Sequence, residues 1–124
     1  MRMMEYIERS YHMNCIFCKI AAGEIPSNKV YEDDKVLAFY DLEPQAPVHF
    51  LVIPKEHISG ANMITAENSD IVAHIFEVIA KATAELGLDG GFRVVTNCGE
   101  DGGQTVSHIH FHLLGRRLLA WPPG

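Results

Sequence analysis

The clearest periodic pattern in the chain is an alternation of histidine with large apolar residues between positions 108 and 113. Histidine stands at 108, 110 and 112, and apolar residues stand at 109, 111 and 113. Because successive side chains of a β-strand point to opposite faces, the three imidazoles share one face and the apolar residues share the other. The pattern predicts a strand over residues 108–112 that packs one face into a core and presents histidines on the other.

Hydrophobic patterning elsewhere predicts two helices and four more strands. Apolar positions recur with a helical period from Thr65 to Leu86, and Gly87 supplies the stop of this long helix. A short helix follows Asn14, its expected N-cap, and ends at Gly23. Apolar runs bounded by turn residues predict strands at 30–31, 36–41, 49–53 and 92–96. Together the elements predict an α+β fold: a five-stranded antiparallel sheet ending in the histidine strand, with the long helix on one face and one short N-terminal helix.

Length and composition favour one domain. The chain has 124 residues, of which 48% are hydrophobic, and we expect a domain over residues 14–124 preceded by an extension, residues 1–13. A net charge of −6 argues against general affinity for nucleic acid or an anionic membrane. No stretch approaches the ~18 apolar residues of a membrane span. Three cysteines fit a reducing compartment better than a disulfide framework, so we expect a cytoplasmic protein.

The histidine row allows two chemical interpretations. In the first it binds metal, but positions 108 and 112 of a strand lie roughly 13 Å apart and cannot share an ion, whereas neighbours such as His108 and His110 can. In the second, a central neutral imidazole is a nucleophile and its neighbours hold charge or move protons. The strand geometry favours the second. Neither His12 nor His74 is assigned a function, and His74 is expected to be solvated near Asp70.

Two other groups carry possible chemistry. Cys15 and Cys18 lie three residues apart at the start of the short helix, which gives half of a zinc site or, alternatively, two small thiols with no metal. A thioredoxin-like redox pair is disfavoured because no βαβ pattern surrounds it. The glycine-rich loop at 97–107 precedes the histidine row directly. Its amide groups, with the Thr105 hydroxyl, can hold a phosphate beside the imidazoles.

The segment His108–Leu114 has the form H-φ-H-φ-H-φ-φ, where φ is hydrophobic, and this form is the signature of the histidine triad family. The chain resembles that family from Cys15 to Gly124, and most closely its nucleotide-binding branch, which hydrolyses nucleoside phosphoramidates. The likeness covers residues 16–20, 49–55, 101–105, the triad and the terminal Trp-Pro-Pro-Gly. The resemblance implies the HIT-like fold over residues 14–124 and a homodimer with strands or helices paired across its axis.

The resemblance also implies a reaction. His110 attacks the α-phosphorus of a purine nucleoside 5′-phosphoramidate, expels the amine and forms a nucleotidyl-imidazole that water then cleaves. His112 and Thr105 stabilise the charge on the phosphate oxygens, and His108 and His49 complete the catalytic histidines. No catalytic metal is required.

Binding residues follow from the same resemblance. Family members with such a cysteine pair often bind a structural zinc, which implies the ligands Cys15, Cys18, His57 and His108. The base is expected in an apolar pocket, the ribose hydroxyls at an aspartate, and the phosphate or leaving group at the glycine-rich loop and the terminal tail. The expected nucleotide-binding residues are Phe17, Ile20, Phe39, Asp41, Leu42, Asn97, Gly103, Gln104, Thr105 and Trp121.

Two alternatives to this function stay open, besides a metalloenzyme built on neighbouring histidines. One is a nucleotide-binding or signalling protein with little turnover. The other is a dinucleoside polyphosphate hydrolase, which the terminal Trp-Pro-Pro-Gly disfavours. The chain departs from the family pattern at Thr105, where serine is common, at Arg116, where a second glycine is common, and in the apolar tail at 118–120. These departures bear on substrate range.

Overall fold

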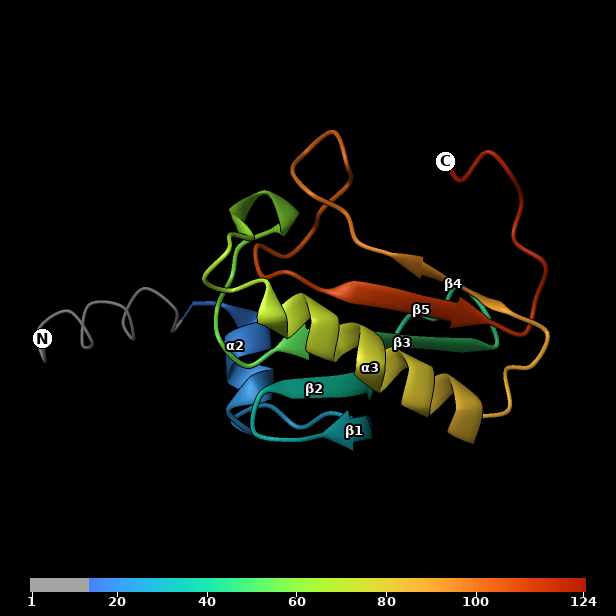
Figure 1. Ribbon diagram of the computed structural model, residues 1–124, viewed down its shortest axis with the longest axis horizontal. Helices are drawn as coiled ribbons and strands as arrows, with labels where there is room; N and C mark the ends of the chain where they lie inside the picture. The colour runs from blue at the N-terminus through green and yellow to red at the C-terminus, as the bar shows by residue number, and fades with distance from the viewer. Residues whose placement is uncertain (1–13) are drawn as a thin grey trace, which may run out of the picture.

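The computed structural model describes residues 14–124, and Figure 1 shows one sheet with a long helix lying across one of its faces. The strands follow the order β1-β2-β3-β5-β4, and every neighbouring pair is antiparallel. The predicted α+β fold is therefore confirmed. The predicted extension, residues 1–13, lies outside the described residues. The elements are α2 (Ile16–Ala21), β1 (Lys29–Glu32), β2 (Val36–Tyr40), β3 (Val48–Pro54), the 3₁₀ helix η1 (Ala61–Met63), α3 (Asp70–Glu85), β4 (Phe92–Val95) and β5 (Phe111–Gly115).

Strand β3 lies at the centre of the sheet and is buried along its whole length. Leu37 of β2 pairs with Ile53 on one side of it, and His112 of β5 pairs with Leu51 on the other. A nearly continuous apolar run is what a strand needs when both of its faces are covered. Because β5 neighbours β3, the pairing also brings His49 close to the histidine row.

Alternate strand residues divide into two apolar clusters, one on each face of the sheet. Val36 and Ala38 of β2 belong to the larger cluster beneath α3. Leu37 and Phe39 belong to the smaller cluster, which also contains Phe17 of α2. The short helix therefore covers the face opposite α3. The side chains that α3 buries are Ile75, Val78, Ile79, Ala82 and Thr83.

The periodicity predicted that the long helix begins at Thr65, but α3 begins at Asp70. The residues before it form turns held by short polar side chains. The amide of Thr65 donates to Oδ1 of Asn68 at 2.6 Å, and the amide of Glu67 donates to Oγ1 of Thr65 at 3.2 Å. Such side chains compete with helix formation for backbone amides. Among residues 14–124, no helix combines the length and apolar character needed to cross a membrane.

Helix α2 is capped by Cys15, not by Asn14. The Sγ atom of Cys15 accepts a hydrogen bond from the amide of Cys18 at 3.4 Å, which is the bond that an N-cap side chain makes. The predicted end of the helix is confirmed, because Gly23 follows its last turn at φ +80°. The cysteine pair is thus part of the helix start itself.

The histidine strand is shorter than predicted. Strand β5 begins at Phe111, so only His112 lies in the ladder, and the first two histidines lie in the irregular segment before it, which bends at His108. That segment bonds to a loop rather than to a strand, since the amide of Ile109 donates to the carbonyl of Ile58 at 2.6 Å. The predicted faces are nevertheless confirmed. Positions 109, 111 and 113 all belong to the apolar cluster beneath α3.

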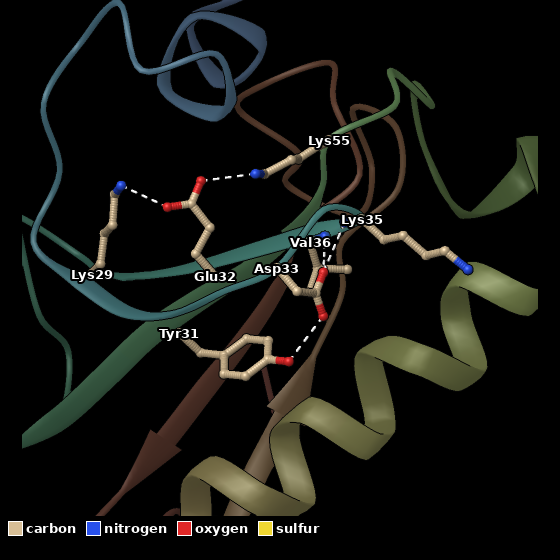
Figure 2. A network of polar contacts seen from close by, with 7 residues as sticks. All are labelled: Lys29, Tyr31, Glu32, Asp33, Lys35, Val36 and Lys55. Carbon is tan, nitrogen blue, oxygen red and sulfur yellow. Dashed lines mark hydrogen bonds and ion pairs between the residues drawn. The ribbon is translucent and has the colours of Figure 1, made fainter.

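The turn between β1 and β2 is bound to α3 through Asp33. Nε2 of His74 lies 2.6 Å from Oδ2 of Asp33, so the prediction of a solvated His74 beside Asp70 is wrong. The partner of His74 is thus a carboxylate on the β1–β2 turn, in place of the expected Asp70 on the helix. Figure 2 shows the other donors to this carboxylate, which are the Tyr31 hydroxyl and the amides of Lys35 and Val36.

Candidate functional site

His110 is 3% exposed and is held by the residue two positions before it. Its Nδ1 lies 2.7 Å from the carbonyl oxygen of His108. Because a carbonyl oxygen only accepts, Nδ1 carries the proton and Nε2 keeps a lone pair. The Phe17 ring packs edge-on against the imidazole, with ring centroids 5.0 Å apart, and limits its rotation. This is the tautomer that a nucleophilic imidazole requires.

His49 and His112 lie side by side because β3 pairs with β5. Nε2 of His49 is 2.9 Å from Nδ1 of His112, and Oδ2 of Asp41 is 3.6 Å from the same Nε2. Burial lowers the pKa of His112 to about 4, aided by the neighbouring imidazoles. Burial also lowers the pKa of His49, although the Asp41 charge opposes it. Both imidazoles are therefore neutral at pH 7.

A cavity of about 470 Å³ lies on the face of the sheet that carries the histidines. Apolar side chains from α2 and β2 line one part of it, while polar side chains that include the Asp41 carboxylate, the Thr105 hydroxyl and three imidazoles line another. A cavity with an apolar part and a few convergent polar groups is typical of a small-molecule site. The predicted residues that line it are Phe17, Ile20, Phe39, Asp41, Leu42, Thr105, His49, His110 and His112.

Gly103 and Gln104 do not line this cavity. Oε1 of Gln104 accepts a hydrogen bond from the Gly99 amide at 2.9 Å, and its Nε2 donates to the carbonyl of Ser59 at 2.7 Å. The Gly103 amide donates to the carbonyl of Glu100. These hydrogen bonds hold the glycine-rich loop in shape, and a phosphate contact by these groups stays a prediction. Thr105 is the predicted residue of that loop that reaches the cavity.

Asn97 lines a second cavity, of about 500 Å³, which shares His49 and His112 with the first. Arg93 and Arg117 border this space. Trp121 is 82% exposed and lines neither cavity. The histidine pair therefore borders both cavities, and most of the predicted nucleotide-binding residues line the first.

The departure at Arg116 has a structural counterpart. Arg116 has φ +65°, in the left-handed region that favours glycine. Its Nη2 atom donates to the carbonyl of Leu86 at 2.6 Å, at the C-terminal end of α3. A cation at a helix C-terminus is favourable, which offsets part of the backbone strain. The tail that follows β5 is thereby tied to α3.

Cys15, Cys18, His57 and His108 form one cluster whose ligand atoms all lie within 4.8 Å of one another. Nδ1 of His108 is 3.4 Å from Sγ of Cys15, and Nδ1 of His57 is 3.2 Å from Sγ of Cys18. Typical zinc bond lengths put sulfur and nitrogen ligands of a tetrahedral ion roughly 3.5 Å apart. The spacing and the donor set both fit a four-ligand zinc site.

The groups around this cluster also suit a metal. Nε2 of His108 lies 2.8 Å from the carbonyl of Pro54, a contact that orients the ring so that Nδ1 faces the cysteines. Burial and the neighbouring Cys15 raise the pKa of Cys18 to about 12. A bound cation would favour the thiolate that this environment otherwise disfavours.

Comparison with known proteins identifies the family. The HIT domain model matches residues 22–119. The chain belongs to the histidine triad (HIT) family. It is 50% identical over 111 residues to a Brassica juncea protein named 14 kDa zinc-binding protein, covering 88% of this chain and 98% of that protein.

Solved structures give the same result. A HIT family hydrolase from Legionella pneumophila superposes with a TM-score of 0.88 at 50% identity, covering 90% of this chain and all of the other. The histidine triad nucleotide-binding protein of Candida albicans superposes with a TM-score of 0.75 at 38% identity, covering 88% and 83% of the two chains. The resemblance that the triad motif suggested is confirmed.

Several residues of this HIT site carried no signal in the sequence. Asn28, Gln45 and Val106 line the 470 Å³ cavity that contains His110, and Arg93 and Arg117 line the second cavity. Gln45 contributes a backbone amide, which donates to Nδ1 of His49 at 3.0 Å. Because every residue except proline has a backbone amide, the residue type at this position does not reveal the contact. The two prolines at 44 and 47 mark the loop that makes it, but not the atom concerned.

Proposed function

We propose that this HIT protein hydrolyses purine nucleoside 5′-phosphoramidates through a covalent nucleotidyl intermediate on His110. The observation that carries the proposal is the bond from Nδ1 of His110 to the carbonyl of His108, which leaves the Nε2 lone pair for attack. This imidazole lines a cavity with room for a nucleotide. Relatives that are named hydrolase and nucleotide-binding protein support the same class of activity.

The cavity suits a nucleoside monophosphate in one orientation. The purine base packs among Phe17, Ile20 and Phe39, whose side chains form the apolar part of the lining. The carboxylate of Asp41 accepts hydrogen bonds from the ribose hydroxyls, and Leu42 contacts the base from outside. This orientation directs the 5′-phosphate toward the histidines. Leu42 is 95% exposed without ligand, so covering it is favourable on binding.

The reaction has two displacement steps. In the first, Nε2 of His110 forms a bond to the α-phosphorus while the bond from phosphorus to the amine nitrogen breaks, and the amine leaves with its electron pair and takes up a proton from solvent water. In the second, water attacks phosphorus and returns a proton to solvent, the bond to Nε2 breaks with its electron pair returning to the imidazole, and AMP is released. Thr105 and His112 donate hydrogen bonds to the phosphate oxygens, where negative charge increases in each transition state. No metal takes part in either step.

We also propose that Cys15, Cys18, His57 and His108 hold one zinc ion. The spacing of their ligand atoms supports it, as does the similarity to a protein named for zinc binding. A closed four-ligand zinc has no open position and supplies structural stability. The ligands come from the start of α2, the loop after β3 and the segment before β5, so the ion joins three parts of the chain.

We propose a cytoplasmic homodimer as the working form. Several large apolar side chains are exposed, including Phe76 on α3, Phe92 on β4, and Leu118 and Trp121 in the tail. An interface that covers them would remove apolar surface from water. Sedimentation equilibrium at micromolar concentration tests this, and a purely monomeric protein would contradict it.

The decisive experiment follows AMP release from adenosine 5′-monophosphoramidate by wild type and by His110→Ala. We expect turnover by wild type and its loss in the variant. Equal rates of AMP release by wild type and His110→Ala would exclude His110 as the nucleophile. AMP binding by wild type with no turnover would instead support a nucleotide-binding protein. Brief incubation with substrate, acid quench and mass spectrometry should find the nucleotidyl adduct on His110 and on no other residue.

A further inference from the structure

His49 lies between two hydrogen-bonding partners, one of which, the backbone amide of Gln45, can only donate. Its Nδ1 is 3.0 Å from the backbone nitrogen of Gln45, and its Nε2 is 2.9 Å from Nδ1 of His112. At 2.9 Å the two imidazole nitrogens are at hydrogen-bond distance, closer than the roughly 3.3 Å between nitrogen ligands of a tetrahedral zinc. One of the two nitrogens must therefore donate and the other accept.

The backbone decides which one donates. An amide N–H can only donate, so Nδ1 of His49 must be the acceptor. A neutral imidazole has one N–H, which then sits on Nε2 and points to Nδ1 of His112. Nδ1 of His112 accepts, so the proton of His112 is on its Nε2. The carboxylate of Asp41, 3.6 Å from Nε2 of His49, favours the same arrangement.

This reasoning requires both imidazoles to be neutral. Burial lowers the pKa values of both His49 and His112 below the ordinary value for histidine, so both are uncharged near pH 7. A doubly protonated His49 would also direct an N–H at the N–H of Gln45. The same amide that fixes the tautomer therefore opposes protonation.

We infer that the backbone amide of Gln45 is a positioning group that sets the tautomer of His112 through His49. His110 then offers a lone pair at Nε2, because its Nδ1–H is bound to the carbonyl of His108, while His112 offers an N–H at Nε2. Two adjacent imidazoles, with ring centroids 5.1 Å apart, thus have opposite polarity: one attacks phosphorus and the other donates to its oxygens. The catalytic consequence rests on the proposed function, but the tautomers do not.

Tautomers are measured directly in the protein without substrate. Long-range ¹H–¹⁵N correlation spectra at pH 7.5 distinguish protonated from unprotonated ring nitrogens. We expect His49 and His112 to carry the proton on Nε2 and His110 to carry it on Nδ1. A proton on Nδ1 of either His49 or His112 would overturn the inference, whatever reaction the protein catalyses.

A pair of variants isolates the amide. Gln45→Pro removes the N–H and the glutamine side chain, while Gln45→Ala removes the side chain and keeps the N–H. We expect His112 in Gln45→Pro to become a mixture of tautomers, and in Gln45→Ala to keep the Nε2–H form. With adenosine 5′-monophosphoramidate, kcat of Gln45→Pro should fall on the order of 100-fold below that of Gln45→Ala, with a smaller change in KM.

A third variant guards against misfolding of the proline form. His49→Ala removes the imidazole between Gln45 and His112, and His112 should then lose its single tautomer. A single Nε2–H tautomer of His112 in His49→Ala or in folded Gln45→Pro would refute the relay. If the spectra agree but no variant or wild type turns over substrate, the relay stands and the proposed function fails.

Discussion

His108 touches both chemical centres of the molecule, since its carbonyl binds Nδ1 of His110 at 2.7 Å and its own Nδ1 lies 3.4 Å from Sγ of Cys15. The backbone of one residue orients the proposed nucleophile, and the side chain of the same residue belongs to the cysteine and histidine cluster. Any change in the cluster that moves His108 also moves the group that fixes the His110 tautomer.

Loss of the cluster should therefore weaken both stability and turnover. Cys18→Ser is expected to abolish zinc binding and lower Tm, because zinc at 100 times its Kd stabilises a fold by about 2.7 kcal/mol. It should also lower kcat, through the displacement of His108. The matched control is Cys98→Ser, since Cys98 contacts Asn62 at 3.3 Å and lies outside the cluster. Metal analysis and calorimetry test this prediction. A wild-type protein whose Tm changes neither with added zinc nor with a chelator would contradict it.

A ribose contact at Asp41 gives a second prediction. Asp41→Asn keeps the size of the side chain and removes its charge, so KM for adenosine 5′-monophosphoramidate should rise roughly tenfold, as expected for losing a charged hydrogen bond. The same substrate without ribose hydroxyls should bind wild type and variant equally. Glu43→Gln, which removes a neighbouring charge, should change KM less. A wild type that does not distinguish ribose from dideoxyribose would exclude the contact.

The sequence predicted the fold and most of the cavity because both depend on residue type and period. The alternation at 108–113 assigned the correct faces even though β5 begins only at Phe111, since Ile109 joins Phe111 and Leu113 in the cluster beneath α3. The Cys-x-x-Cys pair and two distant histidines do assemble. The predicted helix start was wrong because the Thr65 and Asn68 side chains compete for backbone amides, and residue type alone does not say which structure prevails. The role of Gln45 was missed because every residue except proline has a backbone amide.

Acid should destabilise the protein in a window set by the buried histidines. The pKa of His112 is lowered from 6.5 to about 4, so between those values the unfolded chain takes up a proton that the folded chain does not. Stability is therefore unaffected by this group above pH 6.5 and falls as the pH drops toward 4. His49, whose pKa is also lowered, acts in the same direction.

Urea unfolding at pH 7.5, 5.5 and 4.5 tests this window. His112→Gln should be less sensitive to pH than wild type across it, while remaining folded at pH 7.5. Identical pH dependence in the two proteins would show that His112 titrates normally in the folded state.

The contacts of Asp33 predict a separate loss of stability at lower pH. Burial opposes its ionisation, but hydrogen bonds from His74, Tyr31 and two backbone amides outweigh that effect and hold the pKa of Asp33 well below its usual value. A carboxyl whose pKa is depressed on folding stabilises the protein above the unfolded-state pKa, about 3.9, and this contribution is lost as the pH falls below it. It therefore disappears below the window of His112.

Substitution of Asp33 measures the contribution of its carboxylate to stability at neutral pH. Asp33→Asn should lower the free energy of unfolding by about 2 kcal/mol, because four donors lose a charged acceptor and α3 loses its link to the β1–β2 turn. Asp34→Asn is the matched control, since it removes the same charge one residue later at an exposed position and should change stability little. In a double-mutant cycle, His74→Gln should cost much less in the Asp33→Asn background than in wild type. Equal effects of the two aspartate substitutions would show that only net charge matters, and additive effects of Asp33 and His74 would show that their 2.6 Å contact contributes nothing.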